Sequence, residues 1–228
     1  EIEDLANALN AMGGRVQGAG SGIVQIDGVG ALHGVTHGII SDRIEAGSFV
    51  IAAALSGRDV LVRGACGKHL DAFLIKLKEA GVELAADGAG IRVRRRKPIT
   101  SVDVTTLAYP GFPTDLQAQM MVLMAVADGV SVITETIFEN RFMHVQELDR
   151  MGAQIKLEGN RAVVRGVKEL SGAPVMASDL RASVALILAG LVANGITEVA
   201  RVYHLDRGYE QIEKKLSQLG AAIERVPG

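Results

Sequence analysis

One aspartate and three arginines stand at comparable points of a repeated sequence unit, each close to the predicted start of a helix. They are Asp115, Arg141, Arg181 and Arg207. The first turn of a helix presents free backbone N–H groups and the positive end of the helix dipole. Guanidinium groups placed there form a ready site for phosphate or carboxylate. The spacing therefore favours an arrangement in which one carboxylate faces a cluster of guanidinium groups.

Each of these residues also has a purely structural interpretation. Asp115 follows the Pro- and Gly-rich segment YPGFPT and would suit the N-cap of the next helix, a position that Asp prefers. Arg181 lies in the first turn of an apolar helix, where a cation opposes the helix dipole, so it either pairs with Asp179 or binds an anion. Arg207 would form a surface salt bridge beside Asp206.

The segment TETIFENRFMHVQEL places Phe138 and Arg141 in a predicted loop between a strand and a helix. In the simpler interpretation this loop is solvated, and Asn140 or Glu139 caps the helix that follows. A loop dense in polar groups on a rigid scaffold is also where function tends to lie. Both interpretations stay open for this segment.

The elements that must position these residues repeat along the chain. Four segments each read as an amphipathic helix, a Gly at the C′ position and a hairpin, and they begin at Leu5, Leu70, His144 and Tyr209. The C′ glycines are Gly13, Gly81, Gly152 and Gly220. Every copy is predicted to be a helix followed by two strands.

A second element lies between these copies, at residues 41–65, 113–138 and 177–203. In each, Ser or Thr precedes an Asp at a predicted N-cap, and an almost wholly apolar helix and a β-branched strand follow. A helix that is apolar on every side must be buried nearly all round.

Together the two elements form a β-α-β-α-β-β module of about 64 to 73 residues, measured between Asp42, Asp115 and Asp179. The module begins near Gly38 and recurs three times. Residues 1–37 contain only the second half of a copy, and residues 221–228 supply only the first strand of the last hairpin. Because a sheet that lacks a strand leaves an unpaired edge, we interpret the chain as part of a longer protein, cut inside one repeat.

Composition fits a globular enzyme of a reducing compartment. The chain has 228 residues, a net charge of −2 and a hydrophobic fraction of 48%, so no basic excess indicates a nucleic-acid partner. The single cysteine, Cys66, excludes an intramolecular disulfide. The apolar stretches at residues 120–127 and 184–193 are too short for membrane insertion. The five histidines show no metal-ligand spacing, so no metal site is predicted.

The segments YPGFPTDLQAQ, TETIFENRFMHVQELDRMGA, APVMASDLRAS and RVYHLDRGYEQIEKKLSQLGA resemble the signature segments of the bacterial UDP-N-acetylglucosamine enolpyruvyl transferases. That family has two domains, each an α/β fold of β-α-β-α-β-β modules with pseudo-threefold symmetry, an inside-out α/β barrel. The resemblance implies that residues 1–37 are the tail of a truncated first domain. Residues 38–228 would be the second domain, lacking strands that come from the native N-terminus.

The resemblance implies a cytoplasmic transferase of peptidoglycan synthesis, cell shape and cell division. It would move the enolpyruvyl group of phosphoenolpyruvate to the 3-hydroxyl of UDP-N-acetylglucosamine with release of phosphate, without a cofactor. The residues that match catalytic positions are Asp115, the proposed base, and Arg207. The residues that match substrate-binding positions are Asp115, Ile137, Phe138, Arg141, Asp179, Arg181 and Arg207.

Part of the family pattern has no counterpart here. The mobile loop that carries the family's acid cysteine is absent, and Cys66 lies in a different context. We therefore expect the chain to be inactive without its missing N-terminal half. Two alternatives remain, a 3-phosphoshikimate 1-carboxyvinyltransferase and a non-catalytic binding or assembly module built from the same repeats.

Overall fold

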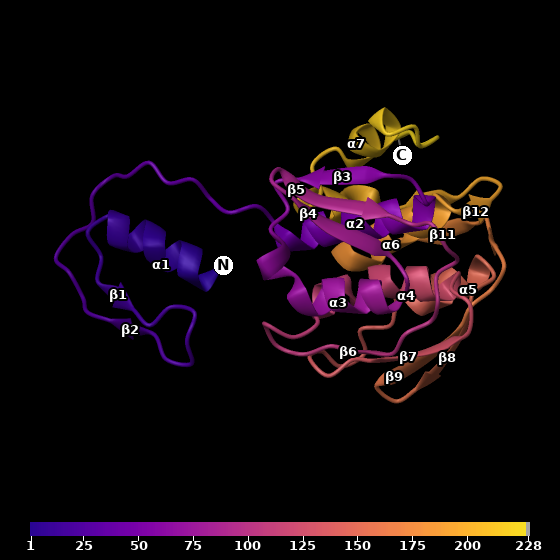
Figure 1. Cartoon of the computed structure of the whole chain (residues 1–228), viewed down its shortest axis with the longest axis horizontal. Coiled ribbons are helices and arrows are strands. Elements are labelled where there is room, and N and C mark those ends of the chain that lie inside the picture. The colour runs from indigo at the N-terminus through magenta and orange to yellow at the C-terminus, as the bar shows by residue number, and fades with distance from the viewer. Residues whose placement is uncertain (227–228) are drawn as a thin grey trace. The chain divides into compact units, whose positions relative to one another are not determined.

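The structure is a computed structural model that describes residues 1–226. The chain divides into two compact units, Glu1–Asp42 and Arg43–Gly228. In the first unit, helix α1 (Ile2–Ala11) is followed by strands β1 (Val16–Gln17) and β2 (Gln25–Ile26), which pair antiparallel (Figure 1). This order, a helix and then two strands, is the one predicted for the segment from Leu5.

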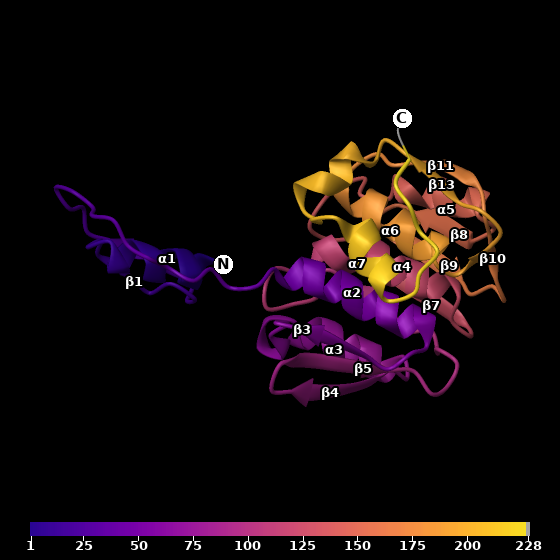
Figure 2. The same cartoon turned by 90° about the horizontal axis from the view of Figure 1, so that it is seen from above.

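The second unit is built around the helices α2 (Arg43–Ser56), α4 (Gln117–Ala125) and α6 (Leu180–Gly190). Figures 1 and 2 show these helices side by side in the interior of the unit, with the strands lying outside them. Every residue of α4 is buried, as the all-round apolar sequence requires. The predicted arrangement, with helices inside and sheets outside, is confirmed. Within residues 1–226, no helix has the length and apolar character needed to cross a bilayer.

The middle module is complete and follows the predicted β-α-β-α-β-β order. It consists of β6 (Val104–Thr105), α4, β7 (Val130–Thr134), α5 (His144–Arg150), β8 (Gln154–Glu158) and β9 (Arg161–Arg165). The strand order in the sheet is β6-β7-β9-β8, with β6 parallel to β7 and the other neighbours antiparallel. The short strand β6 precedes α4 in the chain, and the longer strand β7 follows it.

The first module lacks a strand that the sequence predicts. It contains β3 (Val60–Arg63), the 3₁₀ helix η1 (Gly67–His69), α3 (Asp71–Glu79), β4 (Glu83–Asp87) and β5 (Gly90–Arg94), in the sheet order β3-β5-β4. The strand expected before α2 is absent from the described residues 34–42. A strand is stable only when a neighbour completes its hydrogen-bond ladder, and here no described strand does so.

The third module is the most irregular. It contains β10 (Leu170–Ser171), β11 (Pro174–Met176), α6, β12 (Ala193–Asn194), β13 (Glu198–Ala200), the 3₁₀ helix η3 (Val202–Arg207) and α7 (Ile212–Gln218). β10 pairs with β12 and β11 with β13, both parallel. The strand predicted after α7 is wrong for residues 221–226, which form no strand, and residues 227–228 lie outside the described part of the chain.

Helices α1, α3, α5 and α7 end in the same turn. The glycines at their C′ positions, Gly13, Gly81, Gly152 and Gly220, have φ angles of +91°, +91°, +88° and +94°. In each turn the residue after the glycine donates its N–H to the carbonyl of a leucine five positions earlier, at Leu9, Leu77, Leu148 and Leu216. This is the Schellman motif, and it confirms the predicted glycine stops.

We expect Gly152→Ala to destabilise the protein by about 1 kcal/mol, because a left-handed backbone is strained for any residue with a Cβ. Nothing lies within 4 Å of the position that this Cβ would take, so the cost comes from the backbone alone. Urea unfolding measures the change. Gly88→Ala is the control, since its Cβ would also meet open space and its φ lies outside the left-handed region. Equal losses for both variants would contradict the interpretation.

Candidate anion-binding site around Asp115

Asp115 lies in the 3₁₀ helix η2 (Thr114–Leu116), directly before α4. The prediction that its side chain caps a helix is wrong, because neither η2 nor α4 has a side-chain cap. The carboxylate turns instead toward two guanidinium groups. Its Oδ1 atom lies 2.6 Å from Nη2 of Arg141 and 3.3 Å from Nε of Arg181. A charged partner thus outcompetes the backbone N–H groups for this oxygen.

The two arginines come from different modules. Arg141 lies in the loop between β7 and α5, and Arg181 lies in the first turn of α6. All three side chains are partly buried, with exposed fractions of 35% for Asp115, 26% for Arg141 and 17% for Arg181. Burial of Asp115 on its own raises its pKa, but Arg181 and Arg141 together hold the pKa below its ordinary value. The carboxylate is therefore an anion held between two cations.

Asp179 is the N-cap of α6 and not the ion-pair partner of Arg181. Its Oδ1 accepts the backbone N–H groups of Arg181 at 2.8 Å and Ala182 at 2.9 Å. Burial acts to raise the pKa of Asp179, yet these hydrogen bonds and the Ser178 hydroxyl keep the pKa lowered. The side chain of Arg181 is left free to reach Asp115. The cap at Asp179 is confirmed. The predicted pairing of Arg181 with Asp179 is wrong, because the guanidinium pairs with Asp115, and the anion-binding interpretation of Arg181 stays a prediction.

Arg141 is held from three sides. Its Nη1 donates to Oγ1 of Thr114 at 2.8 Å, and its Nη2 donates to Asp115. Its Cζ lies over the ring of Phe138, 4.9 Å from the ring centroid. Phe138 and the neighbouring Ile137 are exposed. The structure thus brings the predicted residues Asp115, Arg141 and Phe138 together.

Arg207 ends η3 and is exposed. The predicted salt bridge with Asp206 is wrong, because both carboxylate oxygens of Asp206 accept hydrogen bonds from Arg225, at 2.7 and 3.0 Å. Within residues 1–226, the Arg207 side chain makes neither a hydrogen bond nor an ion pair. Its guanidinium is therefore available to an external anion, although no contact joins it to Asp115.

The sequence interpretation missed Tyr209, whose buried hydroxyl meets polar groups from each central helix. Oη lies 2.7 Å from Oγ of Ser48 in α2, 3.4 Å from Nε2 of Gln119 in α4 and 3.5 Å from Nη1 of Arg181 in α6. Burial raises the pKa of this phenol. The signal that was available was the presence of polar residues such as Ser48 and Gln119 within mostly apolar helices.

His144, the first residue of α5, is fully enclosed near the site. Burial lowers its pKa to about 4, and the charge of Arg141 acts in the same direction. Its Nε2 has no hydrogen-bond partner among the described residues. The imidazole is thus neutral in the folded protein. No group of His, Cys, Asp and Glu side chains in residues 1–226 is arranged to hold a metal ion.

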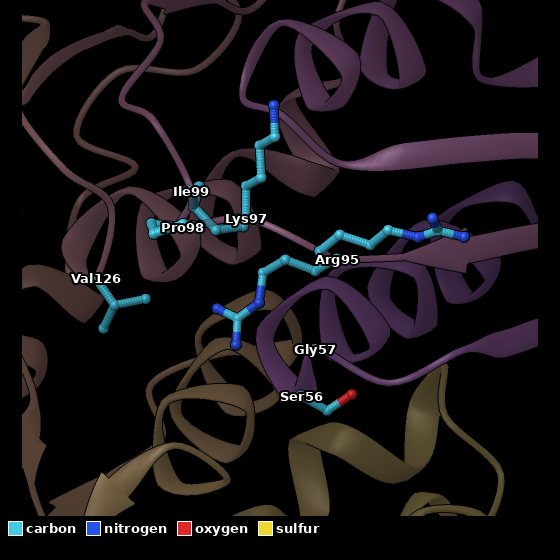
Figure 3. Close-up of a pocket in the computed structure, with 8 residues that line it drawn as sticks. Ser56, Gly57, Arg95, Lys97, Pro98, Ile99 and Val126 are labelled. Carbon is cyan, nitrogen blue, oxygen red and sulfur yellow. The ribbon is translucent and has the colours of Figure 1, made fainter.

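A separate cavity of about 460 Å³ lies at the C-terminal ends of α2 and α4, away from Asp115. It is lined by Ser56, Gly57, Arg95, Arg96, Lys97, Pro98, Ile99 and Val126 (Figure 3). Because α4 has nine residues, it separates this cavity from Asp115 by about 13 Å. The Arg95 guanidinium lies beside Gly57 at the C-terminal end of α2, where the helix dipole attracts a cation. Helix C-termini disfavour anions, so we place the candidate site at Asp115.

Fold and site together define a class, an α/β protein of repeated β-α-β-α-β-β modules that gathers charged side chains at the N-terminal ends of buried helices. The family model described as EPSP synthase (3-phosphoshikimate 1-carboxyvinyltransferase) matches residues 1–216. The chain belongs to this family. Its predicted resemblance to the enolpyruvyl transferases is confirmed.

Curated relatives and solved structures agree with this assignment. The chain is 63% identical over 226 residues to UDP-N-acetylglucosamine 1-carboxyvinyltransferase of Desulfatibacillum aliphaticivorans, and 61% identical over 226 residues to the protein of the same name from Geotalea daltonii. Each match covers 99% of this chain and 54% of the relative, so the chain spans about half the length of these relatives.

Among solved structures, the enolpyruvyl transferase NikO from Streptomyces tendae matches with a TM-score of 0.86 at 28% identity, over 97% of this chain and 53% of its own. EPSP synthase from Acinetobacter baumannii matches with a TM-score of 0.76 at 19% identity, over 97% of this chain and 55% of its own, a likeness of fold alone. The predicted fold class is confirmed.

We expect Asp115→Asn to destabilise the chain by about 1 to 2 kcal/mol, because it leaves two partly buried guanidinium groups without their anion. Inorganic phosphate should then raise the melting temperature of the variant more than that of the wild type, since the anion replaces the lost carboxylate. Thermal unfolding in phosphate and in chloride of equal ionic strength measures this difference.

The matched control is Asp59→Asn. Asp59 also joins two arginines, Arg92 and Arg94, but on the exposed surface of a sheet. Its loss should cost little and create no added response to phosphate. A phosphate response of equal size in both variants would mean that the Asp115 site has no special affinity for anions.

We expect the stability of the protein to fall by about 3 kcal/mol as the pH drops from 6.5 to about 4, because of His144. In this window the unfolded chain binds a proton that the folded chain excludes. Asp115 and Asp179, whose pKa values are lowered, lose their contribution only below this window. His144→Gln should flatten the slope of unfolding free energy against pH in urea titrations. An unchanged slope would exclude His144 as its source.

Proposed function

We propose that the chain is the second-domain part of an enolpyruvyl transferase that acts on phosphoenolpyruvate and UDP-N-acetylglucosamine. The main observation behind this proposal is that Arg141 and Arg181 hold the Asp115 carboxylate at the N-terminal ends of buried helices. A ligand with a carboxylate and a phosphate is bound best by more than one guanidinium group. Relatives about 60% identical bear the name UDP-N-acetylglucosamine 1-carboxyvinyltransferase, which supports the choice of acceptor.

The ion pairs of Asp115 suggest how substrate binding activates it. A carboxylate with a lowered pKa is a weak base, because the neighbouring cations stabilise its charge. When phosphoenolpyruvate binds, its anionic groups compete for Arg141 and Arg181 and weaken their hold on Asp115. The pKa of the carboxyl group then rises toward its ordinary value. Binding of one substrate thereby prepares the base for the other.

Asp115 has an oxygen available for the acceptor. Both guanidinium groups make their shortest contacts to Oδ1, and Oδ2 accepts no hydrogen bond from a described residue. In the proposed reaction the sugar 3-hydroxyl gives its proton to Asp115, and its oxygen bonds to C2 of phosphoenolpyruvate while C3 gains a proton. The resulting tetrahedral intermediate then loses phosphate, and C3 gives up a proton to restore the double bond. The developing negative charges lie where the arginines can stabilise them.

The other candidate residues have supporting roles in this proposal. Arg207, which lacks a described partner, closes over phosphoenolpyruvate and assists catalysis. The exposed ring of Phe138 shapes the sugar pocket. The N–H of Ile137 is already bonded to Glu135 at 2.8 Å, so its carbonyl is the group that meets the nucleotide sugar. Asp179 fixes the first turn of α6 and thus the backbone position from which the Arg181 side chain extends.

We place the remaining catalytic parts outside this chain. Residues 1–37 would be the tail of the first domain and residues 38–228 the second domain. The missing half of the enzyme would supply the cysteine loop and the strands that complete the first and third modules. The protein would act in the cytoplasm, without a cofactor, in the first committed step of peptidoglycan synthesis, and so support cell-wall biogenesis, cell shape and division.

Two alternatives have less support. A 3-phosphoshikimate 1-carboxyvinyltransferase shares the fold, but the matching EPSP synthase structure is only 19% identical to this chain. A non-catalytic module would use Asp115 as a cap and its arginines as surface pairs. The partly buried cluster at Asp115 does not fit that role, because burying like charges around one carboxylate costs free energy without a ligand to recover it.

We expect phosphoenolpyruvate and UDP-N-acetylglucosamine to be turned over only when this chain is mixed with the part of the Desulfatibacillum aliphaticivorans relative that it does not match. Release of inorganic phosphate measures turnover, and calorimetric titration measures binding. Turnover by the 228-residue chain alone would contradict the division of the site. Failure of the mixed pair to bind either substrate would remove the proposed function.

A substitution at Arg207 distinguishes a ligand contact from a structural role in the same mixture. Arg207→Ala should leave stability within about 0.5 kcal/mol, since the side chain is exposed. It should weaken phosphoenolpyruvate binding by about 30-fold or more, the effect of losing one charged partner. Arg165→Ala is the matched control, because Arg165 is also exposed and its side chain also makes no hydrogen bond or ion pair with a described residue.

A further inference from the structure

A buried carboxylate lies behind the Asp115 site, one residue after the end of β7. It belongs to Glu135, whose exposed fraction is 2%, and within residues 1–226 no other Asp, Glu, Lys or Arg is as deeply buried. No described cation lies within ion-pair distance of it. A buried charge without a counter-ion is costly unless hydrogen bonds satisfy it fully. The position of Glu135 therefore calls for an explanation beyond stability.

Hydrogen-bond donors surround both oxygens of Glu135. Oε1 accepts the Thr106 hydroxyl at 2.8 Å and the backbone N–H groups of Ile137 at 2.8 Å and Phe138 at 3.2 Å. Oε2 accepts the Thr114 hydroxyl at 2.8 Å. These donors belong to η2 and to the segments around β6 and β7. The carboxylate thus ties together the chain segments that carry Asp115, Phe138 and Arg141.

The bond between Thr114 and Glu135 fixes the direction of a second bond. A hydroxyl has one proton, and Thr114 gives its proton to Oε2 of Glu135. The lone pairs of Thr114 Oγ1 must then face its other neighbour, Nη1 of Arg141, at 2.8 Å. Since a guanidinium group can only donate, this is the orientation that Arg141 requires. A freely rotating hydroxyl would spend part of its time pointing its proton at Arg141.

The same carboxylate also sets the surface under Arg141. By accepting the N–H groups of Ile137 and Phe138, Glu135 holds the turn from which the Phe138 ring projects. That ring lies under the guanidinium of Arg141, 4.9 Å from Cζ. Arg141 is therefore contacted by Thr114 at Nη1 and by the Phe138 ring near Cζ, and Glu135 holds both of these neighbours.

We propose that Glu135, acting through Thr114, is a positioning residue that orients Arg141 for its anionic ligand. The inference rests on the proposed function, since it assigns Arg141 to substrate binding. A guanidinium held in one plane before binding loses less freedom when the ligand arrives. Glu135 itself touches no substrate in this scheme. Glu135 thus sets the geometry of the loop that carries Phe138 and Arg141.

The test compares Thr114→Val, Thr114→Ser and Thr106→Val in a chain of full length, made by joining residues 1–228 to the unmatched part of the Desulfatibacillum aliphaticivorans relative. Thr114→Val removes the link to Arg141 and should lower kcat/KM for phosphoenolpyruvate by about ten- to hundredfold. Thr114→Ser keeps the hydroxyl and should recover activity to within about threefold of the wild type. Thr106→Val removes a bond to Glu135 that does not lead to Arg141, so its kcat/KM should also stay within about threefold of the wild type.

A second measurement does not depend on activity. In the 228-residue chain, the side-chain N–H signals of Arg141 should be resolved and slow to exchange by NMR, because the guanidinium is fixed at both ends. Thr114→Val should broaden these signals, and Thr106→Val should leave them unchanged. If the wild-type full-length protein were inactive while these signals behaved as expected, the proposed function would fail and the positioning role of Glu135 would stand.

The proposal is overturned if Thr114→Val keeps both the Arg141 signals and the wild-type kcat/KM. It is also overturned if Thr114→Val and Thr106→Val lose activity equally, since Glu135 would then act only through stability. Glu135→Gln gives a further check. It keeps the size of the side chain, but its NH₂ group would face the hydroxyl and N–H donors that now bond the carboxylate, and it cannot accept their hydrogen bonds. It should broaden the Arg141 signals as Thr114→Val does.

Discussion

The structure depends on one electrostatic constraint, that a single oxygen of Asp115 is shared by guanidinium groups from two different modules. Two cations that converge on one atom repel each other, and their attraction to the anion between them offsets this repulsion. Their side chains start from the loop after β7 and from the first turn of α6, so the N-terminal ends of α4 and α6 must lie together. The apolar packing of the central helices supplies that arrangement, and the N-cap at Asp179 fixes where α6 begins.

The repeated modules form the scaffold, and the site is formed by residues that differ between equivalent positions of these modules. The helices α1, α3, α5 and α7 stop at equivalent glycines, and each turn closes on the carbonyl of a leucine at the equivalent position, so this part of the module is repeated without change. The central helices differ at the positions that face Tyr209, where they present a serine, a glutamine and an arginine. A symmetric fold can thus hold an asymmetric ligand because its equivalent helices carry different polar side chains around one point.

The sequence predicted what depends on local rules. Helix periodicity and the glycine stops predicted the order of elements in the module. The apolar helices predicted which elements lie in the interior. The strand expected after α7 is wrong because a strand needs a neighbour, and local residues do not reveal whether one is present. Asp115 looked like a cap because propensity ignores distant cations. Glu135 and Tyr209 were missed for the same reason, since their partners come from remote segments and leave no periodic signal. The placement of Asp179 at a cap succeeded because capping is local.

The hydroxyl of Tyr209 has a consequence for the order in which the protein forms. Its bond with Ser48 joins residues 161 positions apart, whereas the Schellman turns close over five. The entropic cost of closing a loop grows with its length, so the turns can form early and this bond only after the intervening chain has folded. Arg181 meets the same hydroxyl. A partly folded chain can therefore have formed its helices and hairpins and still lack the anion-binding site.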